Sequence, residues 1–151
     1  MNTIELMKHA SLLCDKSTCG YKIGCLAVRD GGILLEGFNE QLAGEMYCQN
    51  GTCSRQELGL TNGKDPHIVC AIHAEASVIA QAASKGISLE GCDIYVTTFP
   101  CLICARSLVK VGIGHLYYMT DYTDGNQARS LLEANGIEIV NVSKKDTWGE
   151  D

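Results

Sequence analysis

The sequence predicts an α/β fold of three layers, in which a mixed five-stranded sheet lies between two layers of helices. Three observations predict this fold. A helical segment opens the chain, two apolar runs flank a Gly-Gly turn, and strand-like and helix-like segments then alternate to the end. The length of 151 residues fits a single domain over residues 1–151, with a cysteine-containing insert over 40–70.

The first helix and a hairpin are expected in the N-terminal part of the chain. The spacing Asn2-x-x-Glu5 is typical of a capping box, and apolar residues then recur at a helical period, so we expect a helix over 3–15. Residues 25–29 and 33–39 are apolar runs on either side of the Gly-Gly turn, which predicts a β-hairpin.

Helices and strands alternate in the remainder of the chain. We expect helices over 73–85, 101–111 and 126–134, and strands over 93–98, 116–119 and 137–142. Pro100 suits the first helical position, and Asp124-x-x-Gln127 can cap the last of these helices. Because a helix separates the last two strands, we expect them to run parallel.

Charge and cysteine content limit the classes of function. The formal net charge is −6, and the longest basic cluster is Lys144–Lys145, which disfavours a nucleic-acid polymer and favours a free small molecule as ligand. Nine cysteines, an odd number, without an export signal at the N-terminus predict a reducing, cytoplasmic location. No apolar run approaches the roughly 20 residues of a membrane span.

The strongest motif combines His73-Ala74-Glu75 with Pro100-Cys101-Leu102-Ile103-Cys104. Cys101 and Cys104 lie on one face of a predicted helix and can reach one ion, with His73 as a neutral third ligand. Three protein ligands leave the fourth tetrahedral position to water, which is typical of catalytic zinc. Two alternatives are a redox cysteine pair and a closed structural zinc site. A redox pair does not require the His-x-Glu upstream, and a closed structural site requires a fourth protein ligand.

Glu75 is expected to act as the proton-transferring residue beside this zinc. Zinc lowers the pKa of a bound water to about 7, and a carboxylate two residues from His73 can take the proton and deliver it to a ring nitrogen and a leaving amine. His-x-Glu followed by Pro-Cys-x-x-Cys is a known signature of zinc deaminases. The motif therefore predicts hydrolytic loss of ammonia from an amidine carbon.

At these residues the chain resembles the cytidine/deoxycytidylate deaminase superfamily, and its deoxycytidylate (dCMP) branch most of all. The resemblance extends over nearly the whole chain and includes Ser17-Thr18-Cys19, Ile23-Gly24, Gly37-Phe38-Asn39, Cys70-x-x-His73-Ala74-Glu75, the run from Tyr95 to Cys101, Ala105, Gly112-Ile113 and Thr120-Asp121-Tyr122. It implies a cytidine deaminase-like fold, Zn²⁺ on the three ligands above, Glu75 as proton shuttle and conversion of dCMP to dUMP.

The resemblance also implies substrate contacts. Asn39 is expected on the sugar hydroxyl, the Ala74 backbone against the pyrimidine edge and Tyr122 near the base, while Thr98 and Phe99 adjoin the metal loop and are expected to line the pocket. The alternatives are a turn residue for Asn39, core packing for Phe99 and an ordinary surface aromatic for Tyr122.

The chain differs from the family at positions where arginine usually binds the substrate phosphate. Gly20 and Thr123 stand where relatives have arginine, and Lys22 or Arg55 are the candidate replacements. Three other hypotheses therefore stay open. In the first, the substrate is another nucleoside or a riboflavin-pathway-like aminopyrimidine. In the second, the substrate is a tRNA adenosine. In the third, the chain is a non-enzymatic, zinc-stabilised nucleotide sensor.

The insert offers a second set of metal ligands. Cys48, Cys53, His67 and Cys70 give the spacing C-x4-C-x13-H-x2-C, which can bind a second, structural zinc. The resemblance further implies a homo-oligomer, either a dimer or a hexamer, and regulation by dCTP and dTTP through the region of residues 40–70.

Overall fold

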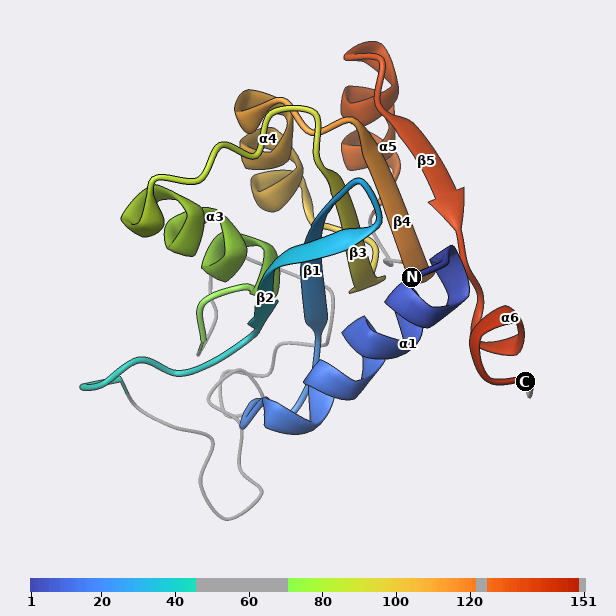
Figure 1. Ribbon diagram of the computed structural model, residues 1–151. Coiled ribbons are helices and arrows are strands. Elements are labelled where there is room, and N and C mark those ends of the chain that lie inside the picture. Colours follow the sequence, from blue (N-terminus) through green and yellow to red (C-terminus); the bar gives the residue numbers. More distant parts are fainter. Residues whose placement is uncertain (46–70, 122–124, 150–151) are drawn as a thin grey trace.

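The computed structural model describes residues 1–45, 71–121 and 125–149, which form one five-stranded sheet with helices on both faces (Figure 1). The strands lie in the order β2-β1-β3-β4-β5. They are β1 (Gly24–Arg29), β2 (Gly32–Phe38), β3 (Asp93–Thr98), β4 (His115–Thr120) and β5 (Glu138–Asn141). β1 is antiparallel to β2 and β3, whereas β3, β4 and β5 run parallel, so the predicted mixed sheet and its parallel last two strands are confirmed.

Helices α3 (Ala74–Lys85), α4 (Leu102–Val111) and α5 (Asn126–Ala134) cover one face of the sheet, and α1 (Thr3–Leu13) covers the other (Figure 1). The short helix α6 (Lys144–Trp148) packs beside α1. The interior strand β1 explains how two cores form, because its side chains alternate between the faces. Cys25 and Ala27 pack with α3, while Leu26 and Val28 pack with α1. A strand buried on both faces is continuously apolar, as this one is.

The expected element boundaries need two corrections, and one expectation falls outside the described residues. The first helix ends at Leu13 and continues as a short 3-10 turn over Cys14–Lys16. Pro100 was expected at the first helical position, but Cys101 has extended backbone (ψ 167°) and α4 begins at Leu102. Asp124, the expected cap of α5, lies outside the described residues, and Gly125 occupies the N-cap position.

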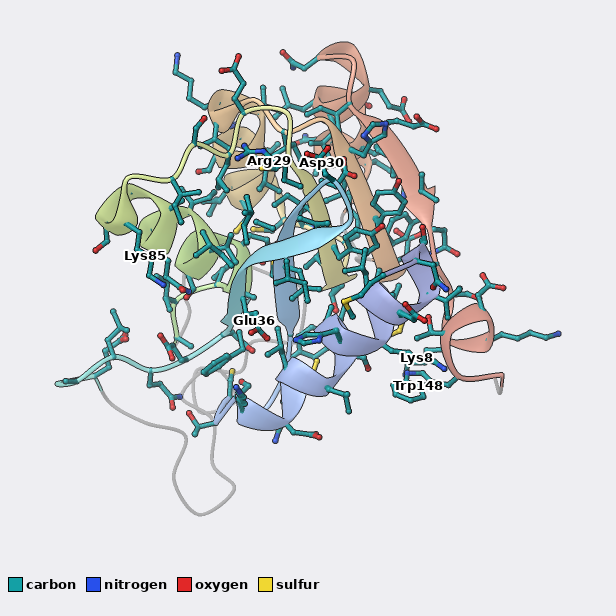
Figure 2. The ribbon with its side chains drawn as sticks, in the orientation of Figure 1. Lys8, Arg29, Asp30, Glu36, Lys85 and Trp148 are labelled. Carbon is teal, nitrogen blue, oxygen red and sulfur yellow. The ribbon has the colours of Figure 1, made fainter. Side chains whose placement is uncertain are left out.

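The sequence reasoning missed helix α6. Its start is marked by a capping box in which Ser143 accepts from the Asp146 backbone and Asp146 accepts from the Ser143 backbone, a Ser-x-x-Asp spacing visible in the sequence. Its end contacts α1, where the Lys8 ammonium lies 5.5 Å from the centre of the Trp148 ring (Figure 2). Across the described parts of the chain, no helix is long and apolar enough to cross a membrane.

A close approach between β2 and α3 positions the start of α3. A Cβ atom at Gly37 would lie 2.7 Å from the Ala74 carbonyl oxygen and 2.8 Å from a methyl carbon of Val78. Only glycine allows the strand to come this near to the helix. The same contact therefore sets the position of His73, which precedes the first residue of α3.

Substitution Gly37→Ala is expected to lower the free energy of unfolding by about 1–3 kcal/mol, because the added methyl group must push against helix backbone. Denaturant unfolding of the purified protein measures the change. Gly32→Ala is the matched control, since a Cβ there meets its nearest atom at an ordinary 3.5 Å. Equal effects of the two substitutions would contradict the close-approach explanation.

Candidate metal centre

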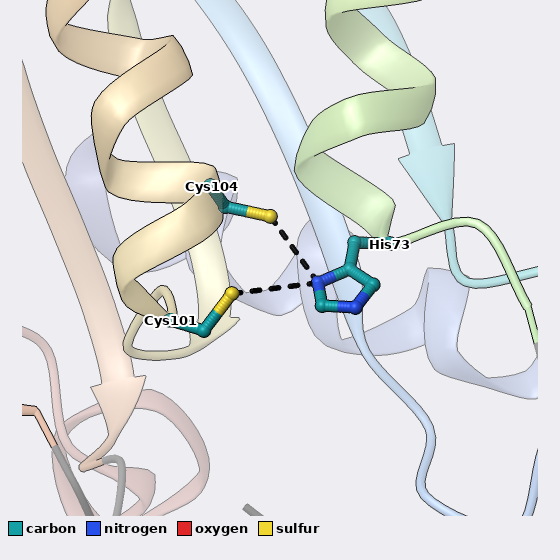
Figure 3. A group of neighbouring side chains, drawn as sticks. All are labelled: His73, Cys101 and Cys104. Carbon is teal, nitrogen blue, oxygen red and sulfur yellow. Dashed lines mark hydrogen bonds between the residues drawn. The ribbon is translucent and has the colours of Figure 1, made fainter. Parts of the chain in front are cut away.

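Two helix starts converge at the carboxyl end of β3. His73 is the N-cap residue of α3, and Cys101 is the N-cap residue of α4. Cys104 lies one turn further along α4, so its sulfur is on the same side of the helix as that of Cys101 (Figure 3). The tertiary fold thus brings together the three ligands that the motif predicted.

The distances within this group fit one ion. The Nδ1 atom of His73 lies 3.2 Å from the Cys104 sulfur and 3.6 Å from the Cys101 sulfur (Figure 3). All three potential ligand atoms lie within 4.8 Å of one another. Among the described residues, no other His, Cys, Asp or Glu joins the group at that spacing. A tetrahedral ion held here keeps one position for a non-protein ligand, as a catalytic zinc does.

The electrostatics of the thiols favour a cation. A hydrogen bond from the Cys104 thiol lowers the pKa of Cys101 to about 4, and the same bond, together with burial, raises the pKa of Cys104 far above its usual value. Both sulfurs lie at the start of α4, whose positive end favours thiolates. A soft divalent cation binds thiolates and displaces their protons, so the donor set fits zinc.

Glu75 is buried in the first turn of α3, at 3% exposure. Burial raises the pKa of its carboxyl group to about 7, and the nearby charges of His73 and Cys101 act on it in opposite directions. The carboxyl group also raises the pKa of Cys104. Glu75 follows His73 by two residues at the start of α3, and its raised pKa lets it hold or release a proton near neutral pH.

This arrangement corresponds to a known family. The model of the cytidine and deoxycytidylate deaminase zinc-binding region matches residues 1–120. The chain belongs to this family. Its membership and the His/Cys/Cys group together identify the cofactor as Zn²⁺.

Curated relatives of this deaminase chain include bacterial, yeast and phage proteins. ComE operon protein 2 of Bacillus subtilis (strain 168) is 33% identical over 90% of this chain and 68% of its own length. Deoxycytidylate deaminase of Enterobacteria phage T4 is 28% identical over 97% and 92%, respectively. The chain matches only 41% of the length of the deoxycytidylate deaminase of Schizosaccharomyces pombe, with 29% identity.

A solved structure has the same architecture. The dCMP deaminase of cyanophage S-TIM5, in complex with dCMP and dUMP, superposes with a TM-score of 0.76 at 27% identity, covering 93% of this chain and 98% of the phage chain. The predicted fold, the mixed five-stranded sheet of a cytidine deaminase-like protein, is thereby confirmed.

The structure places Asn39 beside the loop that joins α1 to β1. Its amide oxygen accepts from the Ile23 backbone at 2.8 Å, and its amide nitrogen donates to the Tyr21 carbonyl at 2.5 Å. Ser17 donates to the Asn39 carbonyl at 2.7 Å. Asn39 therefore holds this loop, and one further amide hydrogen is available to a sugar hydroxyl. The expected sugar contact stays a prediction.

The other expected pocket residues lie around the metal group. Ala74, the first residue of α3, and Phe99 are both buried in the main core, and Thr98 is the last residue of β3 and also buried. Phe99 is packed in the core, which was the alternative to a place in the pocket wall. A role of Phe99 as a pocket wall stays a prediction. Tyr122 and the second metal set, Cys48, Cys53, His67 and Cys70, lie outside the described residues.

Sequence reasoning missed two side chains near this site. Thr97 accepts from the Gly24 backbone at 3.1 Å and so links β3 to the start of β1. The Arg129 guanidinium of α5 lies over the ring of Phe99, two residues before the ligand Cys101. No spacing signal could have found either, because both contacts join residues remote in sequence.

Proposed function

We propose that this chain is a hydrolytic deaminase that converts the cytosine amino group of dCMP to a carbonyl and releases ammonia. The observation that carries the proposal is a His/Cys/Cys group whose ligand atoms lie within 4.8 Å of one another, with the buried Glu75 two residues from His73. The choice of dCMP is supported by similarity to deoxycytidylate deaminases along most of the chain, one of them solved with dCMP and dUMP. The formal charge of −6 supports a free nucleotide over a tRNA substrate.

In the proposed reaction, the residues of the chain act as follows. His73, Cys101 and Cys104 hold the zinc, which when bound supplies a Lewis acid that makes water acidic at neutral pH. Glu75 takes one proton from the attacking water and gives it to the pyrimidine ring nitrogen. It then takes the proton of the newly added hydroxyl and gives it to the leaving amino group, as the C–N bond breaks and the carbonyl forms. The buried Ala74 backbone lies one residue from both His73 and Glu75, where it can orient the pyrimidine edge.

A deamination screen tests this proposal. Zinc-loaded protein is incubated separately with dCMP, CMP, deoxycytidine, cytidine, cytosine and dCTP, and loss of cytosine absorbance and release of ammonia are followed. Protein stripped of zinc is the control. We expect the largest kcat/KM with dCMP. Turnover of another compound without dCMP turnover would reject this substrate, and nucleotide binding without any turnover would favour the sensor hypothesis.

The same resemblance supports proposals about assembly and regulation, and the odd number of cysteines supports a reducing, cytoplasmic location. We infer a cytoplasmic homo-oligomer, a dimer or a hexamer, whose activity responds to dCTP and dTTP. Light scattering of the purified protein gives its mass, and kinetic assays with and without each triphosphate test regulation. A monomer that is insensitive to both nucleotides would refute these two proposals.

A further inference from the structure

Phe99 lies between the end of β3 and the zinc ligand Cys101. Its backbone N–H donates to the Thr120 carbonyl at 2.8 Å, which extends the pairing between the strands beyond β3. Its ring meets the Tyr118 ring edge-on, with ring centres 5.0 Å apart and an interplanar angle of 87°. The side chain is only 1% exposed. The turn from β3 into α4 is thus anchored through this one aromatic residue.

Arg129 of α5 covers this aromatic pair. Its guanidinium carbon lies 4.4 Å from the centre of the Phe99 ring and 5.4 Å from that of Tyr118. Its Nη2 atom donates to the Asp121 carboxylate at 3.1 Å and to the Tyr118 hydroxyl at 3.4 Å. The contact between the guanidinium and the Phe99 ring and the two donated bonds hold Arg129 over Phe99, from a helix that supplies no zinc ligand.

We propose that Arg129 is a positioning residue that fixes the turn through Phe99 and thereby the Cys101 sulfur. Ligands of a metal must be held within a small tolerance, and groups outside the first ligands typically change metal affinity by about 10–100-fold. Pro100, between Phe99 and Cys101, is fully buried and transmits a shift of the ring to the ligand. Without the guanidinium, the Phe99 ring loses the group packed over it, and the turn from β3 into α4 is held less firmly.

The position of Arg129 at the ends of β3 and β4 also suits another role, direct contact with the substrate phosphate. That role would not involve Phe99. A phosphate contact changes only the KM for phosphorylated substrates, whereas a positioning residue changes zinc affinity and kcat, whichever pyrimidine is turned over. The two roles are therefore separable by measurement.

The first test compares Arg129→Met and Arg129→Lys with Arg106→Met. Arg106 is an exposed arginine on α4, so its substitution is the matched control. Competition with a chromogenic chelator measures zinc affinity without any substrate, and its result is thus separate from the substrate screen. We expect about a tenfold weaker affinity for Arg129→Met, a smaller loss for Arg129→Lys, which keeps the charge but not the plane, and no change for the control.

Kinetics with dCMP and deoxycytidine complete this comparison. The proposal expects kcat to fall for both substrates in Arg129→Met, with little change in KM. A KM increase for dCMP alone, with normal zinc affinity, would overturn the proposal in favour of phosphate binding. A lower melting temperature of the zinc-free protein with wild-type zinc affinity and kcat would overturn it in favour of a purely structural contact.

A double-mutant cycle tests whether Arg129 acts through Phe99. Phe99→Leu removes the ring but keeps an apolar side chain, so the variant is expected to fold. If Arg129 acts through the ring, Arg129→Met in the Phe99→Leu background causes little further loss of zinc affinity. Fully additive losses would show that the two residues act separately and would overturn the proposal.

Discussion

The variant Glu75→Gln is expected to lose about 10²–10⁴-fold in kcat, the usual contribution of a positioned general acid–base group. The amide has nearly the same size as the carboxylate but cannot accept the proton of the attacking water. The effect is expected on kcat rather than on zinc content, because Glu75 is not one of the three ligands. Steady-state kinetics and metal analysis of the same preparation measure both quantities.

Glu133→Gln is a suitable control for this change. Glu133 is exposed on α5, so the same chemical substitution there should leave kcat unaltered. If Glu75→Gln retained kcat within about threefold of the wild type, Glu75 would not be the proton-transferring residue. If the variant lost its zinc, the carboxylate would instead be required to maintain the ligand group.

The second large effect is expected from Cys104→Ala, which removes one of the two thiolates. Two ligands remain, and we expect zinc to be lost together with all measurable deamination. The contribution of zinc to the free energy of unfolding should also disappear. This contribution is about 4 kcal/mol when the free zinc concentration is 1,000 times the dissociation constant. Thermal unfolding with and without added zinc, together with metal analysis, checks the prediction.

Cys92→Ala distinguishes loss of a ligand from loss of a buried cysteine. Cys92 is fully buried in the main core, and its sulfur accepts from Arg29 at 3.1 Å. This substitution should lower the melting temperature but leave zinc content and the zinc-dependent increase in stability intact. A Cys104→Ala protein that still bound zinc and was stabilised by it would refute the three-ligand assignment.

The sequence predicted those features that depend on residues close together in the chain. The Asn2–Glu5 capping box, the hairpin around its Gly-Gly turn and helices ending at Gly86 and Gly112 are local patterns, and each occurs in the structure. The boundary at Pro100 was wrong because the extended backbone of Cys101, and not the proline preference, sets the start of α4.

By itself, the sequence predicted the zinc ligands and an acid–base residue, because zinc deaminase chemistry uses residues such as His73, Glu75, Cys101 and Cys104 at short, characteristic spacings. The structure brings His73, Cys101 and Cys104 together, and the role of Glu75 stays a prediction. Only the tertiary structure decided what holds them in place. Three contacts join segments far apart in the chain: the tight approach at Gly37, the attachment of Asn39 to the α1–β1 loop and the placement of the Arg129 guanidinium over the Phe99 ring. Such contacts depend on the order of the strands and on the packing of the helices against the sheet. Neither can be predicted from the spacing of residues in the sequence.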